Sequence, residues 1–298
     1  MKKKSIILVL LVILSLTLAL TGCYAKYGTV KEGIFEYDVQ DGKAILKGYT
    51  DNTGVTKVVI PDEIDGAPVV KLDDYAVVNT LYVTEMFIGK NVEEITPFSI
   101  NNNNGLKTFT VHPENKFFKA IDGTLYTIDG KELVSNPIQN GVTEHECFDD
   151  KGKPVLDVKG NKTYDKYRDL FVIPDGVETV RDNAFYHNII KKVVMADSVK
   201  VVGECSFLRI SYLSEVVFSK NLEVIGKDAF SKNGGLKEVT IYGNIKEIGT
   251  FAFFDCEKLK IVNIAASEEN IKLGKKWYPT KLGKKIKDIV YNWNYQVK

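Results

Sequence analysis

The sequence predicts a solenoid, a fold in which short segments of chain stack as successive coils, and three regularities support this fold class. A nine-residue block recurs in the C-terminal half, with copies at 177–185, 199–207, 222–230 and 245–253. Each copy ends in a small residue and a phenylalanine, spaced by 22, 23 and 23 residues, at Ala184-Phe185, Ser206-Phe207, Ala229-Phe230 and Ala252-Phe253. A hydrophobic segment with the pattern of a strand follows each block. One such unit cannot bury its own hydrophobic face, so the units are expected to stack.

The residues of one unit indicate two extended stretches and a turn. Val239 and Ile241 alternate with polar neighbours, as expected of a half-buried strand. After a second extended stretch at 245–248, Gly249 is expected to provide a backbone conformation that other residues resist. The next segment is too short for more than one turn of α- or 3-10 helix. We expect Ala252 to let neighbouring coils approach, while Phe253 fills the layer between them.

The same register continues toward the N-terminus in less regular copies. Two turn blocks, 70–77 and 92–100, carry Val77 and Ile100 where the later copies have phenylalanine. Strands are expected to end near Ile60, Ile88, Val111, Ile173, Met195, Phe218, Ile241 and Ile264. The N-terminal coils should therefore pack less regularly than the C-terminal ones.

These motifs carry a family resemblance. The frame 173–177 with the Ala184-Phe185 pair, the segments 60–69 and 122–133, and the opening 35–49 are similar to the BspA-type leucine-rich repeat of bacterial surface proteins, over about 33–265. The resemblance implies a leucine-rich-repeat solenoid, which is a right-handed, strand-rich β/α superhelix with short helical or 3-10 turns and a parallel strand ladder on its concave face. It also implies a secreted or surface-anchored protein that binds proteins or host surfaces, with no catalytic residues and no cofactor.

An insertion at about 114–169 interrupts the repeat. The strand ends Val111 and Ile173 are 62 residues apart. Residues 117–128 alternate between turn signals at Asp122-Gly123 and Asp129-Gly130, which predicts a hairpin. Residues 140–169 are polar and rich in glycine, lysine and aspartate, which indicates a loop that bulges from the solenoid. Such a loop is either a plain or disordered insertion or a functional element.

The first 22 residues predict a lipoprotein signal peptide. Three lysines precede an apolar run of fifteen residues, 6–20, which is shorter than the roughly 20 residues that span a bilayer. The run ends in Leu20-Thr21-Gly22-Cys23, which resembles a bacterial lipobox and implies cleavage before Cys23 and a lipid on its sulfur. An ordinary signal peptide with a chance cysteine is the alternative. We therefore expect an extracytoplasmic, lipid-anchored protein with a tether and cap at 23–57, a solenoid at 58–267 and a C-terminal cap at 268–298.

Charge and composition argue against several functions. Without the three signal lysines the chain has 37 basic and 39 acidic residues, a net charge of −2, and no concentrated basic face of a nucleic-acid binder. Cys147, Cys205 and Cys256 cannot all pair, and we interpret them as small buried hydrophobic residues, although one oxidised pair stays open. His145-Glu146-Cys147 is too short a cluster for a metal site. The sequence has no phosphate-binding loop and no nucleophile elbow, so no catalytic residue is assigned.

The outward side chains of the strand ladder are the main candidates for binding. Stacked strands should align them on the concave surface, where solenoids usually bind, and the candidates are Phe87, Lys192, Glu215, Glu238, Thr240 and Asn263. Their mixture of apolar, hydroxyl and charged groups suits a protein partner, and adhesion to a host or another cell is the role that such a partner suggests. The alternative is that valine and threonine occur here because they favour strands.

The C-terminal segment suggests a second binding site or a cap. Ile289, Tyr291, Trp293 and Tyr295 alternate, as expected of a strand that covers the last coil. Residues 268–298 carry eight lysines against three acidic residues. The functional interpretation is that lysines contact a glycan, a wall polymer or lipid headgroups, and the candidates are Lys275, Lys276, Lys284 and Lys285. A structural spacer in the envelope without a ligand is the third interpretation.

Overall fold

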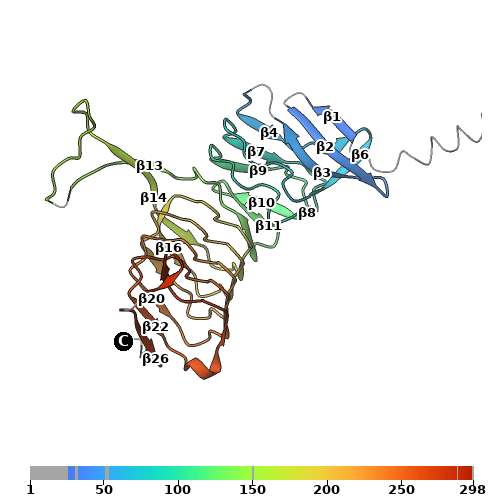
Figure 1. The fold of residues 1–298 in the computed structure, drawn as a ribbon. Helices are drawn as coiled ribbons and strands as arrows, with labels where there is room; N and C mark the ends of the chain where they lie inside the picture. The colour runs from blue at the N-terminus through green and yellow to red at the C-terminus, as the bar shows by residue number, and fades with distance from the viewer. Residues whose placement is uncertain (1–25, 31–32, 51–53, 150, 287, 297–298) are drawn as a thin grey trace, which may run out of the picture.

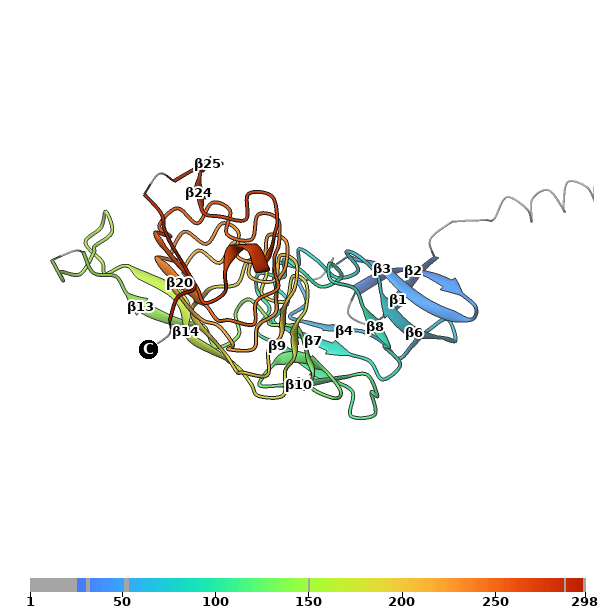
Figure 2. The same cartoon turned by 90° about the horizontal axis from the view of Figure 1, so that it is seen from below.

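The computed structural model describes residues 26–30, 33–50, 54–149, 151–286 and 288–296. Figure 1 shows an N-terminal strand-rich part, a C-terminal column of stacked coils and an arm that projects from the region between them. Figure 2 shows the same three parts from below, with the arm again extending away from the coils. The one helix among the described residues is the 3-10 helix η1, Glu268–Asn270. The signal segment and Cys23 lie outside the described residues.

The C-terminal column is built on two parallel ladders. The first ladder joins short strands of successive coils: β12 Glu132–Ser135, β15 Thr179–Val180, β17 Val201–Val202, β19 Val224–Ile225, β21 Glu247–Ile248 and β23 Lys272–Leu273. The second ladder has two sheets. One contains β14 Tyr164–Ile173, β16 Ile190–Met195 and β18 Glu215–Val217, and the other contains β20 Glu238–Ile241, β22 Ile261–Ile264 and β26 Val290–Trp293. The predicted solenoid with a parallel strand ladder is confirmed.

The phenylalanines of the recurring block form a continuous stack inside the column. The rings of Phe185, Phe207, Phe230 and Phe253 follow one another with centroid distances of 4.7, 5.0 and 5.5 Å and interplanar angles of 11°, 3° and 9°. All four side chains are fully buried. The small residue before each ring is buried too. In the last three blocks its carbonyl accepts the N–H of the phenylalanine one coil earlier, as from Phe207 to Ala229 at 2.8 Å, and in the first block the carbonyl of Ala184 accepts the N–H of Asn136. The segment is therefore a hydrogen-bonded turn that closes each layer of the core.

A column of glycines brings neighbouring coils into backbone contact. A Cβ atom added at Gly226 would lie 2.7 Å from the carbonyl carbon of Gly203, and one added at Gly249 would lie 2.6 Å from that of Gly226. Neither Gly226 nor Gly249 has a positive φ angle. The expectation that Gly249 provides a special backbone conformation is therefore wrong. Glycine is needed there because the adjacent coil leaves no room for a side chain.

Larger residues take the left-handed backbone positions. Asn183, Cys205, Asp228 and Phe251 have φ angles of 59°, 54°, 53° and 60°. This conformation costs about 1–2 kcal/mol for a residue with a Cβ atom. Each of the four donates its N–H to a carbonyl of the next coil at 2.9 or 3.0 Å. These hydrogen bonds between coils offset much of the strain.

The N-terminal part has its own hydrophobic core. Six strands form a mixed sheet at its outer end: β1 Lys26–Val30, β2 Gly33–Gln40, β3 Lys43–Thr50, β5 Glu63–Ile64, β6 Ala67–Leu72 and β8 Glu94–Ile95. A parallel sheet of β4 Lys57–Val59, β7 Glu85–Ile88 and β9 Thr108–Val111 lies beside it, on the side nearer the C-terminal column (Figure 1). Phe35 and Tyr37 of β2 are buried in this core, and so are Val77 and Ile100 at the positions where later coils have phenylalanine.

Residues 114–173 divide into a hairpin, one ladder strand and the arm. The hairpin pairs β10 Phe118–Ile121 with β11 Thr124–Thr127 around the turn Asp122-Gly123. β12 then enters the first ladder beside β15. The segment that the sequence indicated as a bulging loop forms the arm, in which β13 Thr143–Glu146 pairs antiparallel with the first half of β14. The second half of β14 pairs parallel with β16, so one strand belongs to both the arm and the column.

The C-terminal residues cover the last coil. β26 pairs parallel with β22. Trp277 is buried and meets the rings of Tyr291 and Trp293 edge-on, with centroid distances of 5.7 and 6.1 Å. The short hairpin β24 Thr280–Lys281 and β25 Lys284–Lys285 lies beyond this aromatic cluster.

Candidate binding surface

The six ladder residues predicted to contact a partner lie on separate sheets. Phe87 is on β7 in the N-terminal part, whereas the other five are on β16, β18, β20 and β22. Within each strand they alternate with buried residues, namely Met86, Val193, Val216, Val239 and Val262. All six therefore project from the strand face opposite the core, although a single ligand on one sheet would not contact all of them.

Two of the predicted contact residues neutralise each other. Lys192 Nζ lies 2.6 Å from Glu215 Oε1, and both side chains remain about half exposed. An exposed ion pair of this kind contributes little to stability, so both groups remain available to a partner.

The polar residues at the other end of the ladder form a closed network. Asn263 Nδ2 donates to Glu238 Oε1 at 2.7 Å and to Thr240 Oγ1 at 3.1 Å. Asn292 Nδ2 of the covering strand β26 donates to Asn263 Oδ1 at 2.6 Å. Asn263 is only 2% exposed. It therefore organises its neighbours and offers almost no surface to a ligand.

The ladder is interrupted between β18 and β20. Glu215 and Glu238 occupy the same position in successive coils, and like charges on adjoining strands are destabilising. No backbone pairing joins these two strands among the described residues. Each carboxylate interacts with a residue on the strand away from the break. Glu215 forms an ion pair with Lys192 on β16, and Glu238 accepts a hydrogen bond from Asn263 on β22. The break therefore separates an apolar half of the ladder from a polar half.

The apolar half carries an exposed stripe, which we define as Leu170, Val172, Val194 and Val217. Leu170 is 43% exposed and Val172 is 53% exposed, and Val194 and Val217 continue the row as half-buried side chains on β16 and β18. Adjacent exposed apolar side chains commonly mark contact sites. Sequence analysis missed Leu170 and Val172 because the polar segment before them indicated a loop. The segment Leu170-Phe171-Val172-Ile173 is apolar throughout, so it shows no alternation that would have identified the exposed pair.

The arm extends this surface with further exposed apolar side chains, which are Phe148, Val155, Leu156, Val158 and Tyr164. Two similar turns shape its outer end. The carboxylate of Asp149 accepts the N–H groups of Lys151 and Lys153, both at 2.9 Å, and that of Asp157 accepts those of Lys159 and Asn161 at 2.8 and 2.9 Å. The repeated Asp-x-Lys-Gly pattern was the sequence signal for these turns.

Aromatic contacts fix the base of the arm against the column. His145 of β13 stacks on Tyr167 of β14 with a centroid distance of 3.8 Å and an interplanar angle of 4°. Tyr212, from a later coil, lies 5.2 Å from Tyr167, and its hydroxyl donates to Asp165 Oδ1 at 3.1 Å. Burial and the bond to Asp165 raise the pKa of Tyr212. Lys191 Nζ lies 5.2 Å from the Tyr167 ring. The direction of the arm is thus set by the coils below it.

A charged stripe runs beside the first ladder. We define it as the residues that directly precede five neighbouring strands, which are Lys131, Glu178, Lys200, Glu223 and Lys246. Ion pairs join Lys131 to Glu178 at 3.0 Å, Glu178 to Lys200 at 2.8 Å and Glu223 to Lys246 at 2.7 Å. Hydrogen bonds from both lysines lower the pKa of Glu178. Because positive and negative groups alternate, this stripe compensates itself and is a poor site for an ionic ligand.

Phe87 lies in a separate polar and aromatic setting. Lys57 Nζ is 5.7 Å from its ring centroid, and the His112 ring meets it edge-on at 6.2 Å. Glu85 Oε1 lies 2.9 Å from Lys57 Nζ and accepts the hydroxyl of Thr110 at 2.9 Å. The hydrogen bond from Lys57 lowers the pKa of Glu85. Phe87 is half-buried among these groups, so the N-terminal sheet offers a mixed surface.

The four lysines proposed for polyanion contact are all exposed. Lys284 and Lys285 lie on the terminal hairpin, with Lys285 Nζ 5.0 Å from the Tyr278 ring. Lys275 and Lys276 lie at the turn before Trp277. None of the four has an acidic partner within 4.0 Å among the described residues, in contrast to Lys272, which pairs with Glu247 at 2.8 Å.

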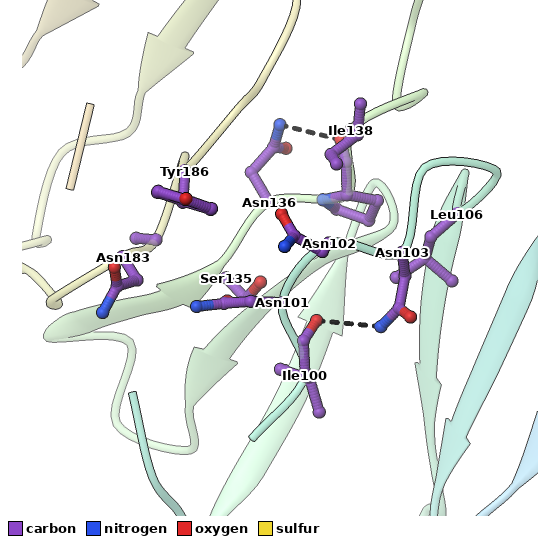
Figure 3. A pocket seen from close by; sticks show the side chains of 12 residues that line it. Ile100, Asn101, Asn102, Asn103, Leu106, Ser135, Asn136, Ile138, Asn183 and Tyr186 are labelled. Atoms are coloured by element: carbon purple, nitrogen blue, oxygen red, sulfur yellow. Dashed lines mark hydrogen bonds between the residues drawn. The ribbon is translucent and has the colours of Figure 1, made fainter. Parts of the chain in front are cut away.

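The region between the two cores contains a small polar cavity. Figure 3 shows asparagine side chains around it, including Asn102, Asn136 and Asn183. Its volume is about 20 Å³, enough for one water molecule but not for a ligand. Asn102 Oδ1 and Asn183 Nδ2, from two residues that line this cavity, are buried and lack a hydrogen-bond partner within the described part of the chain.

The described residues contain no cluster of three or more metal-ligating side chains. Cys147, Cys205 and Cys256 are free thiols. Burial raises the pKa of Cys205 to about 11 and that of Cys256 to about 12. None of the helices in the described residues has the length and apolar character needed to cross a bilayer.

The stacked rings and the two parallel ladders define a repeat solenoid, and the stripe is an exposed part of its strand face. Residues 164–275 match the BspA type leucine rich repeat region in six copies, so this segment consists of BspA-type repeats, as the resemblance indicated. Proteins with such repeats are typically bacterial surface proteins and generally non-enzymatic scaffolds that bind other proteins. Among curated proteins, none matches the sequence.

Several solved structures resemble the chain at low identity. The pneumococcal vaccine antigen PcpA is 14% identical, with a TM-score of 0.47 and coverage of 89% of this chain and 87% of PcpA. A leucine-rich repeat protein from Bacteroides ovatus is 16% identical, with a TM-score of 0.45 and coverage of 89% and 71%. A leucine rich cell surface protein from Faecalibacterium prausnitzii is 16% identical, with a TM-score of 0.43 and coverage of 85% and 95%. At these identities the similarity concerns the fold alone, and the ligand of this chain is not inferred from these structures.

Proposed function

We propose that this protein is a cell-surface interaction protein without enzymatic activity, and that it binds another protein along β14. The observation that carries the proposal is the apolar stripe, which begins with the exposed Leu170 and Val172 on β14, the strand that also forms the arm, and continues with Val194 on β16 and Val217 on β18. A partner lying along β14 would cover the stripe and the exposed side chains of the arm together. Adhesion to a host matrix protein or to another cell is the specific role that we propose.

The arrangement of charge supports a protein ligand on this face. Lys192 and Glu215 flank the stripe as a half-exposed ion pair, which gives the apolar row a polar border. Interfaces between proteins commonly have this organisation, with an apolar centre and a polar rim. The charged stripe beside the first ladder compensates itself and would remain in contact with solvent.

The experiment compares the wild-type ectodomain with Val172→Glu in binding to a panel of matrix proteins, namely fibronectin, laminin, fibrinogen and collagen, and to intact bacterial cells. We expect saturable binding to at least one member and at least about a tenfold loss for Val172→Glu, since a charge at the centre of an interface is strongly unfavourable. Val39→Glu introduces the same charge at a 38% exposed valine of β2 and serves as the matched control. If Val172→Glu and Val39→Glu bind equally well, the partner does not bind along β14.

We also propose that a lipid on Cys23 anchors the protein to the outside of the bacterial membrane. The residues before Cys23 support this role, since they resemble a lipobox. Acyl chains hold a protein at a membrane through the burial of their methylene groups. We expect Cys23→Ser to release the protein into the medium. Retention of Cys23→Ser in the membrane fraction would argue against the anchor.

A second candidate function is binding of a wall polymer through the C-terminal lysines. The lack of acidic partners at Lys275, Lys276, Lys284 and Lys285 favours this candidate. Purified teichoic acid should then bind at low salt and dissociate as salt rises, because screening weakens exposed charge contacts. Replacement of the four lysines by glutamine should abolish this binding. Failure to bind any protein, cell or polymer would favour a role as an envelope spacer.

A further inference from the structure

We propose that the open edge of β9 is a docking site for an extended, acidic peptide segment of a partner protein, which adds to the sheet β4-β7-β9 as one more parallel strand. This inference rests on the proposed protein-binding function and adds a second contact to it. The site is distinct from the stripe on β14, because β9 belongs to the N-terminal core.

The edge exists because the next coil does not supply a strand to this sheet. In the first ladder of the C-terminal column, each coil adds a strand that pairs with its predecessor, from β12 to β23. After β9 the chain instead turns into the hairpin β10–β11, and β12 joins the first ladder. Within the described ranges, no strand pairs with β9 on the side away from β7.

The register of the sheet identifies the free backbone groups. Thr108 N–H donates to the carbonyl of Thr84 at 3.3 Å, and His112 N–H donates to that of Ile88 at 2.9 Å. The backbone N–H and C=O groups of successive residues point to opposite sides of a strand. Because the N–H of His112 points toward β7, the backbone groups of Val111 point away from β7. Val111 N–H has no hydrogen-bond partner among the residues that the structure describes.

The turn of the neighbouring hairpin closes only the first half of this edge. Phe109 N–H donates to the carbonyl of Gly123 at 2.9 Å. A Cβ atom at Gly123 would lie 2.8 Å from Thr108 Oγ1 and 2.8 Å from Asn140 Nδ2, so the turn is packed tightly there. Beyond it, beside Val111, a groove opens with a volume of about 470 Å³. This volume is within the range of about 300–1,000 Å³ that is typical of small-ligand sites.

The lining of the groove indicates the chemistry of its occupant. Val111 and Ala120 present partly buried apolar side chains that adjoin the N-terminal core. Lys119 and His112 are the ionisable groups of the lining, which contains no carboxylate. Lys119 has no acidic partner within 4.0 Å in the described part of the chain. An extended peptide that alternates apolar and acidic residues would therefore match both the backbone groups and the charge.

An added strand would have a defined orientation. In β7 the outward residue Glu85 bonds the preceding strand, since its N–H donates to the carbonyl of Thr56 at 3.1 Å. In a strand placed after β9 in the same register, the residues whose side chains face away from the core would likewise form the backbone hydrogen bonds to Val111. Main-chain bonds of this kind provide the affinity in known cases of strand addition, and side-chain pockets provide the specificity.

The test uses a fluorescent nonapeptide, Glu-Val-Thr-Val-Glu-Val-Thr-Val-Glu, with the protein lacking its signal segment. We expect saturable binding, slower hydrogen exchange of the Val111 amide in the complex, and at least about tenfold weaker binding when lysine replaces each glutamate. N-methylation of the glutamates and threonines should abolish binding, because their N–H groups face β9, whereas N-methylation of the valines should preserve it. Equal effects of the two methylated sets, or unchanged exchange at Val111, would overturn the proposal.

Variants of the protein separate this site from the stripe. Val111→Pro removes the free N–H at a position that does not bond β7, and it should weaken nonapeptide binding at least about tenfold, while Val111→Ala should bind normally. Val172→Glu should leave nonapeptide binding unchanged. Loss of nonapeptide binding with intact partner binding would refute the β9 site alone, and the opposite result would refute the β14 surface alone.

Discussion

Phe207 and Phe230 stack face to face with their centroids 5.0 Å apart and their ring planes 3° from parallel, although 23 residues separate them in the chain. Phe230 also stacks on Phe253 and meets Phe218 edge-on at 5.3 Å. Each ring is thus shared between coils, and cohesion of the column depends on this stack as well as on its backbone ladders.

Phe230→Ala should strongly destabilise the column. Truncation of a buried phenylalanine costs about 3–5 kcal/mol, and here the cavity would open between two coils. The free energy of unfolding, measured by urea denaturation, checks the loss. Phe148→Ala on the arm is the control, because that ring is largely exposed and its loss should change stability by less than about 0.5 kcal/mol. Similar losses for both variants would contradict a special role of the stack.

Gly226→Ala should destabilise the fold even though alanine is a conservative change. The added Cβ atom would overlap the backbone of Gly203, so adjacent coils must move apart, at a cost of about 1–3 kcal/mol. Gly234→Ala is the matched control, since a Cβ atom there would meet nothing within 4 Å. We expect Gly234→Ala to be neutral or to stabilise by up to about 1 kcal/mol through the unfolded chain. Thermal unfolding of the two variants side by side decides the point.

Alkylation of the thiols should follow their burial. Cys256 is fully buried and its pKa is raised to about 12, so at pH 8 it should remain a protonated thiol and resist iodoacetamide until the protein unfolds. Cys205, with a pKa of about 11, should also react slowly. Cys147 is partly exposed at the arm and should react first. Peptide mass spectrometry over time gives the order, and early modification of Cys256 would contradict the packing described for the last coils.

Stability should fall as the pH drops below neutrality, partly through His187. Burial and the nearby Arg209 lower the pKa of His187 in the folded protein. In the unfolded chain the histidine pKa is about 6.5, so the unfolded state binds a proton more readily than the folded state. The contribution of His187 to the free energy of unfolding is therefore present above that pH and is lost as the pH falls below it. His187→Asn keeps a residue that tolerates the left-handed φ of 58° but does not titrate. Urea midpoints at pH 8 and pH 5.5 should differ less for His187→Asn than for wild type.

The regular coils could be predicted from sequence because their determinants are local and repeated. The interval of 22 or 23 residues between small-phenylalanine pairs fixes the stack, and alternation within each strand identifies its buried face. The role of Gly249 could not be deduced in this way, because the requirement lies in the backbone of the adjacent coil rather than in its own conformation.

The arm and the stripe were harder to predict. The arm is held by pairing between residues 143–146 and 164–167, which no local pattern indicates. Exposure of Val172 depends on the arm leading away from the column, so sequence alone could not distinguish it from a buried strand residue. Asn263 was predicted to contact a ligand, but the covering strand β26 buries it. Its placement in the ladder was predictable, whereas its burial depended on the tail.

The charged stripe constrains how such a gene could grow or shrink. The sign at this position alternates from coil to coil, from Lys131 and Glu178 through Lys200 and Glu223 to Lys246. Duplication or deletion of a single coil would set two residues of like charge side by side, whereas gain or loss of two coils would preserve the alternation. The charge pattern of this column therefore repeats every two coils, which is twice the length of the repeat visible in the sequence.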